Sequence, residues 1–326
     1  MSGSYKPPYC TRSSVLFLIF NRPDTTKTVF EQIRMAKPPK LYIAADGPRC
    51  NYPADHELCS KAREIALQID WNCELKTNFR TENAGCKEGV SAAITWFFEH
   101  EDEGIILEDD CVPANSFFKF CDTLLEKYRS DERVRHITGC NLQRGQKWGS
   151  GSYYFSHMTH VWGWAGWKRV WKDYDKKLAK FDREEMAARL RNIFDDTFVV
   201  ESYEKIFDEV KAGKINAWGY QLDFTNFFNY GLTAIPNENL ISNIGFRADA
   251  THTLDANSIY ADIPVQEMDE IVHPETMQAE KQAEYFVLDH IFRVAPQKKG
   301  RMPLINKIKR KTKDFIKAAA ALLLFS

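Results

Sequence analysis

Long apolar runs are missing from this 326-residue sequence. No stretch approaches the roughly 20 consecutive apolar residues that a membrane-spanning helix needs, which excludes a helical integral membrane protein. Residues 1–11 also lack an apolar core, so we expect no secretory signal there. With 44% apolar and 27% charged residues, the composition is that of a globular protein and excludes a disordered chain.

Zinc-binding patterns are missing too, although the chain has eight cysteines. There is no Cys-x-x-Cys pair and no run of cysteine and histidine at zinc spacing. The cysteines occupy positions 10, 50, 59, 73, 86, 111, 121 and 140. We therefore expect reduced thiols and a cytoplasmic protein.

The chain as a whole is nearly neutral, but a segment near its C-terminus has an excess of positive charge. The net charge of −1 gives no reason to expect nucleic acid as a partner. Residues 298–317 hold nine lysines or arginines and one acid, a net of +8, so the remainder carries −9. Apolar residues lie among these lysines, at Leu304, Ile305, Ile308, Phe315 and Ile316. The pattern predicts an amphipathic helix at an anionic membrane surface; a packed helix or frayed tail is the alternative.

Strand-like and helix-like segments alternate through the first half. Short apolar runs at 15–20, 41–45 and 104–107 predict strands, and a further short strand is predicted near residues 75–79. Apolar residues at helical spacing follow each run, for example Val90, Ile94 and Phe97. This alternation predicts an α/β fold, in which helices cover both faces of a largely parallel sheet.

Three adjacent acids follow the fourth predicted strand. Glu108, Asp109 and Asp110 come directly after it, and Pro113 and Ser116 then open a predicted helix. Open α/β sheets bind ligands at the carboxyl ends of their strands. Adjacent carboxylates repel one another, and a divalent cation bound to a diphosphate would relieve that repulsion. The alternative is that the acids only begin a helix, where they complement its dipole.

Residues 105–118, IILEDDCVPANSFF, resemble the acidic metal-binding segment of the N-acetylglucosaminyltransferase I type of glycosyltransferase. The match is close over this segment and loose over residues 15–250. The resemblance implies the glycosyltransferase A fold, a Rossmann-like mixed sheet flanked by helices. It implies a nucleotide-diphosphate sugar donor, such as a UDP-sugar, and Mn²⁺ or Mg²⁺. It also implies that Asp110 binds the metal, that Asp109 faces the ribose and that Glu108 faces the transferred sugar.

Candidates for the rest of the donor pocket follow other strands. The resemblance implies that Asp46, after the second strand, accepts the uracil N3 proton, and that Arg22, after the first, lies near the base or the phosphates. Turns and helix caps are the alternative for both. Lys87 precedes a predicted helix whose backbone amides face the same edge, which favours phosphate. The segment around it is not a P-loop.

The second half must supply a base if the transfer inverts the sugar. Asp223 lies in the aromatic run 218–228, and a carboxylate there can accept the proton of an acceptor hydroxyl. The related transferases carry a Trp- and Asp-containing segment at this stage, followed by a proline loop that residues 235–240 resemble. A cap or pair within a helix is the alternative for Asp223, and Glu238 is the next candidate base.

Two further features of the second half remain open. Residues 243–253 resemble the late loop that closes over the donor, and in several enzymes of this type a late histidine, here His252, completes the metal sphere. A lone histidine is more often structural. Trp164, Trp167 and Trp171 fall at i, i+3 and i+7, which predicts one buried face of a helix. A sugar-stacking platform at residues 162–164 is the alternative.

The sequence therefore predicts a metal-dependent glycosyltransferase that acts on a glycan or a lipid-linked glycan, peripheral at the inner face of the membrane. Residues 1–140 form the predicted nucleotide-sugar half, 141–296 the acceptor half, and 297–326 the basic tail. A sugar-nucleotide pyrophosphorylase is one alternative, although residues 20–23 are not the glycine-rich basic loop that it would need. A non-catalytic glycan-binding protein is the other.

Overall fold

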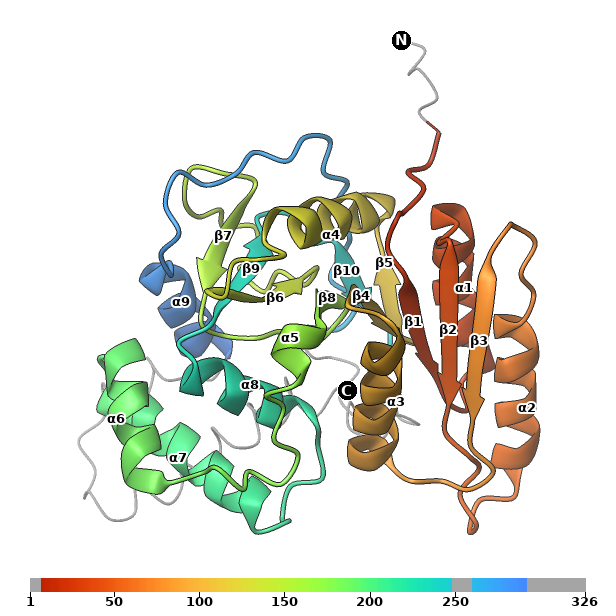
Figure 1. The fold of residues 1–326 in the computed structure, drawn as a ribbon, viewed down its shortest axis with the longest axis horizontal. Coiled ribbons are helices and arrows are strands. Elements are labelled where there is room, and N and C mark those ends of the chain that lie inside the picture. The colour runs from red at the N-terminus through yellow and green to blue at the C-terminus, as the bar shows by residue number, and fades with distance from the viewer. Residues whose placement is uncertain (1–6, 248–259, 292–326) are drawn as a thin grey trace.

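An eight-stranded mixed sheet forms the centre of the molecule (Figure 1). The fold is that of a computed structural model, which describes residues 7–247 and 260–291. The strand order is β3-β2-β1-β4-β8-β6-β9-β7. These strands are β1 (Val15–Ile19), β2 (Lys40–Ala45), β3 (Glu74–Phe79), β4 (Glu103–Glu108), β6 (Val134–Thr138), β7 (Tyr153–Ser156), β8 (Trp164–Trp167) and β9 (Leu232–Pro236).

The first four strands of this order are parallel, as the alternating pattern predicted. Strand β8 runs antiparallel between β4 and β6, and β7 pairs antiparallel with β9 at the edge. Every residue of β1 is buried, because helices cover the sheet on both faces. The predicted α/β class is thus confirmed, with a sheet that is parallel from β3 to β4 and mixed from β8 onward.

The described helices pack on this sheet and in a group beside its second half (Figure 1). Helix α1 neighbours α2 and α4, whereas α3 neighbours α5 on the other face. Helices α6, α7 and α8 contact one another. The helices are α1 (Pro23–Ala36), α2 (Ala54–Ala66), α3 (Cys86–His100), α4 (Asn115–Lys127), α5 (Lys168–Trp171), α6 (Arg183–Ile193), α7 (Thr197–Lys211), α8 (Gly219–Phe228) and α9 (Lys281–Ile291).

One predicted local structure was wrong, and a second begins later than expected. Trp164 and Trp167 belong to strand β8 and not to a helix, because β8 pairs with β4 and β6 on its two edges. All three tryptophans are buried, so their expected place in the core is confirmed. The expected proline loop also begins late: Pro236 ends strand β9. Its missing N–H removes no hydrogen bond to β6, because that pairing reaches only to Ala234.

A second, two-stranded sheet follows the acidic triplet. Strand β5 (Cys111–Pro113) pairs antiparallel with β10 (Ile241–Asn243), where the sequence indicated only the approach to a helix. The pairing brings the segment after β10 to the end of β4. Ile244 donates its N–H to the carbonyl of Asp110 at 2.9 Å. Chain far away in sequence therefore lies against the triplet.

Two predicted features, His252 and the basic tail 297–326, lie outside the described residues. Among the helices of residues 7–247 and 260–291, none has the length and apolar character to cross a membrane. All eight cysteines are free.

Candidate functional site

The acidic triplet lies at the carboxyl end of β4, beside the ends of β1 and β2. Register places Leu18 of β1 opposite Glu108, and Ile19 opposite Ala45 of β2. The residues that follow these strands therefore meet at one edge of the sheet, where open α/β sheets bind ligands. They include Arg22 and Asp46, as the sequence indicated.

Arg22 connects two acids of the triplet. Its Nη1 donates to Asp110 Oδ2 at 2.8 Å, and its Nη2 donates to Asp109 Oδ1. The backbone N–H of Phe20 donates to the other oxygen of Asp109 at 3.1 Å. Asp109 and Asp110 are 2% and 6% exposed, so a positive charge beside them is needed for both to ionise. Arg22 supplies that charge within the described part of the chain.

Burial is the main cause of the raised pKa values of Asp109 and Glu108. It raises the pKa of Asp109 to about 6, although the attraction of Arg22 acts against this rise. Burial and the charges of Asp110 and Asp109 raise the pKa of Glu108 well above its usual range. Glu108 Oε1 is buried and has no hydrogen-bond partner among the described residues. The triplet is therefore short of positive charge and of donors, as a site for a cationic ligand would be.

The segment after β10 closes the triplet from the other side. Gly245 packs so closely on Asp110 that a Cβ on it would lie 2.1 Å from Oδ2. Asn243 Oδ1 accepts the N–H of Gly245 at 2.8 Å and holds this turn. Arg247 then forms an ion pair with Asp24 in the first turn of α1. This side of the site was not visible in the sequence, because it depends on the pairing of β10 with β5.

The carboxylate of Asp46 holds the turn that begins α3. It accepts N–H groups from Ala84 and Gly85 at 2.9–3.1 Å, and the side-chain amide of Asn83 at 3.0 Å. Gly85 has φ +80, which favours glycine at this turn. Lys87 follows in the first turn of α3, half-buried and without an ion pair in the part of the chain that the structure describes.

Asp46 could hold the turn before α3 or recognise uracil, and a substitution distinguishes these two roles. Because both oxygens already accept hydrogen bonds, Asp46→Asn should distort the turn before α3 and weaken all nucleotides alike. Titration with UDP, and with a nucleotide whose base has no N–H at the matching position, measures this. A loss of about 1.5–3 kcal/mol confined to UDP would instead support uracil recognition. Asp70→Asn on the exposed surface is the charge-matched control.

Sequence reasoning missed a second charged group at this edge. Asp55 accepts from Arg49 Nε at 2.6 Å and from Asn21 Nδ2 at 2.8 Å. The guanidinium of Arg49 also lies 4.0 Å from the ring of Tyr52 and 5.5 Å from that of Phe20. A weak indication was present in the sequence. Asn21 follows the same strand as Arg22, and Arg49 follows the same strand as Asp46.

Asp223 lies on helix α8, with Thr159 as its hydrogen-bond partner. Its Oδ1 accepts both the N–H and the hydroxyl of Thr159, and the residue is 2% exposed. Burial raises the pKa of Asp223 to about 7, although both hydrogen bonds act against the rise. The structure therefore brings together Arg22, Asp109 and Asp110, whereas the hydrogen bonds of Asp223 are with Thr159.

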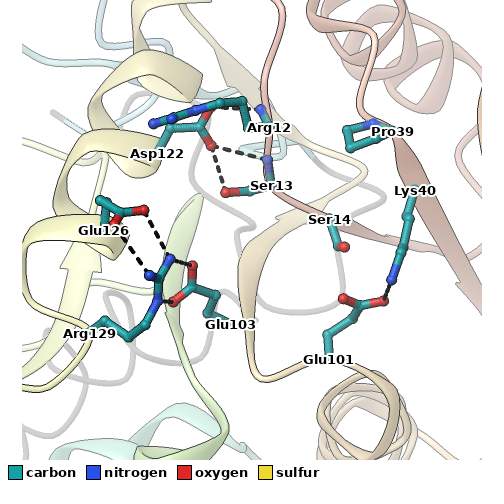
Figure 2. Close-up of a pocket in the computed structure, with 10 residues that line it drawn as sticks. All are labelled: Arg12, Ser13, Ser14, Pro39, Lys40, Glu101, Glu103, Asp122, Glu126 and Arg129. Atoms are coloured by element: carbon teal, nitrogen blue, oxygen red, sulfur yellow. Dashed lines mark hydrogen bonds and ion pairs between the residues drawn. The ribbon is translucent and has the colours of Figure 1, made fainter.

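A charged pocket of about 310 Å³ lies at the opposite edge of the sheet (Figure 2). It is lined by residues that precede or begin β1, β2 and β4, and by helix α4. Five of its charged side chains form ion pairs with one another: Lys40 with Glu101, and Arg129 with both Glu103 and Glu126. We therefore interpret the pocket as part of a structural ion-pair network.

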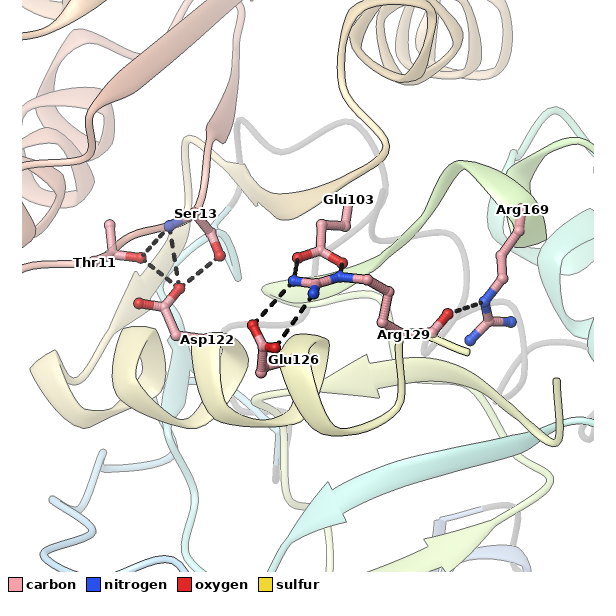
Figure 3. A network of polar contacts seen from close by, with 7 residues as sticks. All are labelled: Thr11, Ser13, Glu103, Asp122, Glu126, Arg129 and Arg169. Carbon is pink, nitrogen blue, oxygen red and sulfur yellow. Dashed lines mark hydrogen bonds and ion pairs between the residues drawn. The ribbon is translucent and has the colours of Figure 1, made fainter. Parts of the chain in front are cut away.

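A second set of polar contacts beside these ion pairs converges on Asp122 (Figure 3). This buried carboxylate accepts from the hydroxyls of Tyr9, Thr11 and Ser13 at 2.6–2.9 Å. It also accepts the backbone N–H groups of Arg12 and Ser13 at 2.7 and 3.2 Å. It thereby ties the chain before β1 to helix α4.

Asp122→Ala should destabilise the fold strongly, because it leaves several of these donors without an acceptor. Each unsatisfied buried group costs about 1–3 kcal/mol, so we expect a loss of about 3 kcal/mol or more in urea unfolding. Glu126→Ala removes an exposed partner of Arg129 on the same helix and should cost below about 1 kcal/mol. Similar losses in both variants would contradict the assignment.

The residues of the triplet fit a divalent cation of the Mg²⁺ or Mn²⁺ type. Among residues 7–247 and 260–291, no group of three or more Asp, Glu, His or Cys side chains is arranged to hold a metal. An ion here would therefore take one or two carboxylates from the protein and its remaining ligands from phosphates and water, as Mg²⁺ commonly does. The unpartnered Oε1 of Glu108 and the oxygens of Asp110 are suited to that role.

No protein-family model matches the chain, and no curated protein matches it. Among solved structures, one match is the crystal structure of HddC from Yersinia pseudotuberculosis. The match covers 50% of this chain and 80% of the HddC chain. The two are 12% identical with a TM-score of 0.29, which is too low to establish a common fold. The function is therefore inferred from the site itself.

Proposed function

We propose that this protein is a metal-dependent glycosyltransferase that moves a sugar from a nucleotide-diphosphate donor to a glycan or lipid-linked glycan. The observation that carries the proposal is the buried acidic triplet at the end of β4, with Arg22 and the first turn of α3 at the same edge of the sheet. It rests as well on the resemblance of residues 105–118 to the acidic segment of N-acetylglucosaminyltransferase I.

A nucleotide diphosphate matches the groups at this edge. The N-terminus of α3 offers backbone N–H groups and Lys87, which suit phosphate. The aromatic rings of Phe20 and Tyr52 lie beside Arg49 and offer surfaces for a base. Carboxylates such as Asp109 accept hydroxyls of ribose. The donor proposed first is a UDP-sugar.

Asp110 and Glu108 would hold Mn²⁺ or Mg²⁺ beside the diphosphate. When bound, the ion supplies positive charge that stabilises the departing nucleoside diphosphate. The protein's own side chains orient the donor and accept a proton. Asp223 is the proposed base: as a carboxylate it takes the proton of the acceptor hydroxyl while that oxygen attacks carbon one of the sugar and the bond to the diphosphate breaks.

The acceptor and the membrane remain proposals from the sequence. The basic tail at 297–326 would hold the enzyme at an anionic surface, where a lipid-linked acceptor lies.

Calorimetric titration tests the proposal. UDP should bind in the presence of Mn²⁺ and much more weakly after EDTA treatment, and a screen of UDP-sugars should reveal donor hydrolysis. Binding of a glycan without any metal-dependent nucleotide binding would contradict the proposal and favour a glycan-binding protein. Turnover of a nucleoside triphosphate with a sugar phosphate would favour a pyrophosphorylase.

A further inference from the structure

The guanidinium of Arg22 already supplies a positive charge to two acids of the triplet. Its two Nη atoms bind one oxygen each of Asp109 and Asp110, so a single charge bridges neighbouring residues. The side chain is only 21% exposed, and it is the positive group that pairs with these two acids in the described chain. A planar fork of this kind holds two carboxylates in a fixed relation.

The two oxygens of Asp110 differ in what already contacts them. Its Oδ2 is bound by Arg22 and covered by Gly245, whereas Oδ1 accepts only the weak S–H donor of Cys111 at 3.4 Å. A metal ion that uses Oδ2 must therefore displace the Nη1 group from it. Two positive charges on one carboxylate oxygen also repel each other at contact distance.

We propose that Arg22 is the resident counter-cation of the triplet and competes with the divalent ion for Asp110. The inference rests on the proposed function for the identity of the ion. Arg22 keeps the empty donor site folded and lowers its affinity for free metal. Once released from Asp110, its N–H groups are donors of the kind that bind phosphate, so the ion binds best together with the nucleotide diphosphate.

Metal affinity without nucleotide tests this competition. After EDTA treatment, wild type, Arg22→Met and Arg22→Lys are titrated with Mn²⁺, and free Mn²⁺ is measured by electron paramagnetic resonance. Arg22→Met should bind Mn²⁺ about tenfold or more tightly than wild type, because its buried carboxylates have lost their partner. Arg22→Lys should fall between them, since one ammonium cannot form the double fork.

Thermal unfolding gives an independent readout. Mn²⁺ should raise the melting temperature of Arg22→Met more than that of wild type, and adding Asp110→Asn should remove the gain. The matched control is Arg34→Met on helix α1, which breaks a pair with the partly exposed acid Glu31 and should leave the affinity for Mn²⁺ unchanged.

The outcomes separate the two proposals. Equal Mn²⁺ affinity in wild type and both Arg22 variants, with Mn²⁺-dependent UDP binding in wild type, overturns the competition and leaves the proposed function standing. Tighter Mn²⁺ binding in Arg22→Met with no UDP binding in any protein supports the competition and overturns the proposed function. If Arg22→Met does not fold without metal, the Arg22→Lys comparison decides in the same way.

Discussion

Asp110→Asn is expected to abolish the metal dependence of nucleotide binding. The change removes the charge that attracts the ion but keeps an oxygen of the same shape beside Arg22 and Gly245. Losing a charge-assisted contact costs about 1.5–3 kcal/mol, which corresponds to a loss of about 10–100-fold in affinity. Titration of UDP with and without Mn²⁺ measures the effect.

The control is Asp131→Asn, which removes an acid that pairs with Arg133 at a distant turn. It should bind UDP with unchanged metal dependence. Asp109→Asn should weaken UDP less than Asp110→Asn does, because ribose contacts are only part of the pocket. Retention of Mn²⁺-dependent binding in Asp110→Asn would show that the ion uses another acid.

Asp223→Asn is expected to slow turnover by about 10²–10⁴-fold while the affinity for UDP and Mn²⁺ stays near that of wild type. Asparagine keeps an oxygen that can accept from Thr159, so the helix should remain in place. The nitrogen cannot accept the proton of an acceptor hydroxyl. Single-turnover kinetics with a hydrolysable UDP-sugar and the acceptor measure the change.

The pH dependence provides a further check on Asp223. Its pKa of about 7 lies above that of an ordinary aspartate, because burial disfavours the charged form. The carboxylate is protonated below this value and cannot act as a base, so turnover should rise with pH through about 7. The variant should lack this rise. Unchanged turnover in Asp223→Asn would transfer the role to another acid, Glu238 first, and loss of UDP binding would make Asp223 structural.

Much of the first half could be predicted from local patterns. The apolar runs at 15–20 and 104–107 became β1 and β4, because a strand covered on both faces must be apolar throughout. The positions of Arg22 and the triplet at one edge follow from parallel strands, whose carboxyl ends share a side. Prediction was poorer in the second half, where the tryptophan spacing indicated a helix and the sheet pairing of β8 produced a strand.

The sequence by itself determined the alternation of strands and helices and the acidic triplet at a strand end, since both depend on neighbouring residues. Only the tertiary structure decided what each acid touches. The bridge from Arg22 to Asp109 and Asp110 joins residues more than eighty positions apart, and Gly245 reaches Asp110 only because β10 pairs with β5. Such contacts depend on how the strands of the sheet pair, and the spacing of neighbouring residues in the sequence does not indicate them.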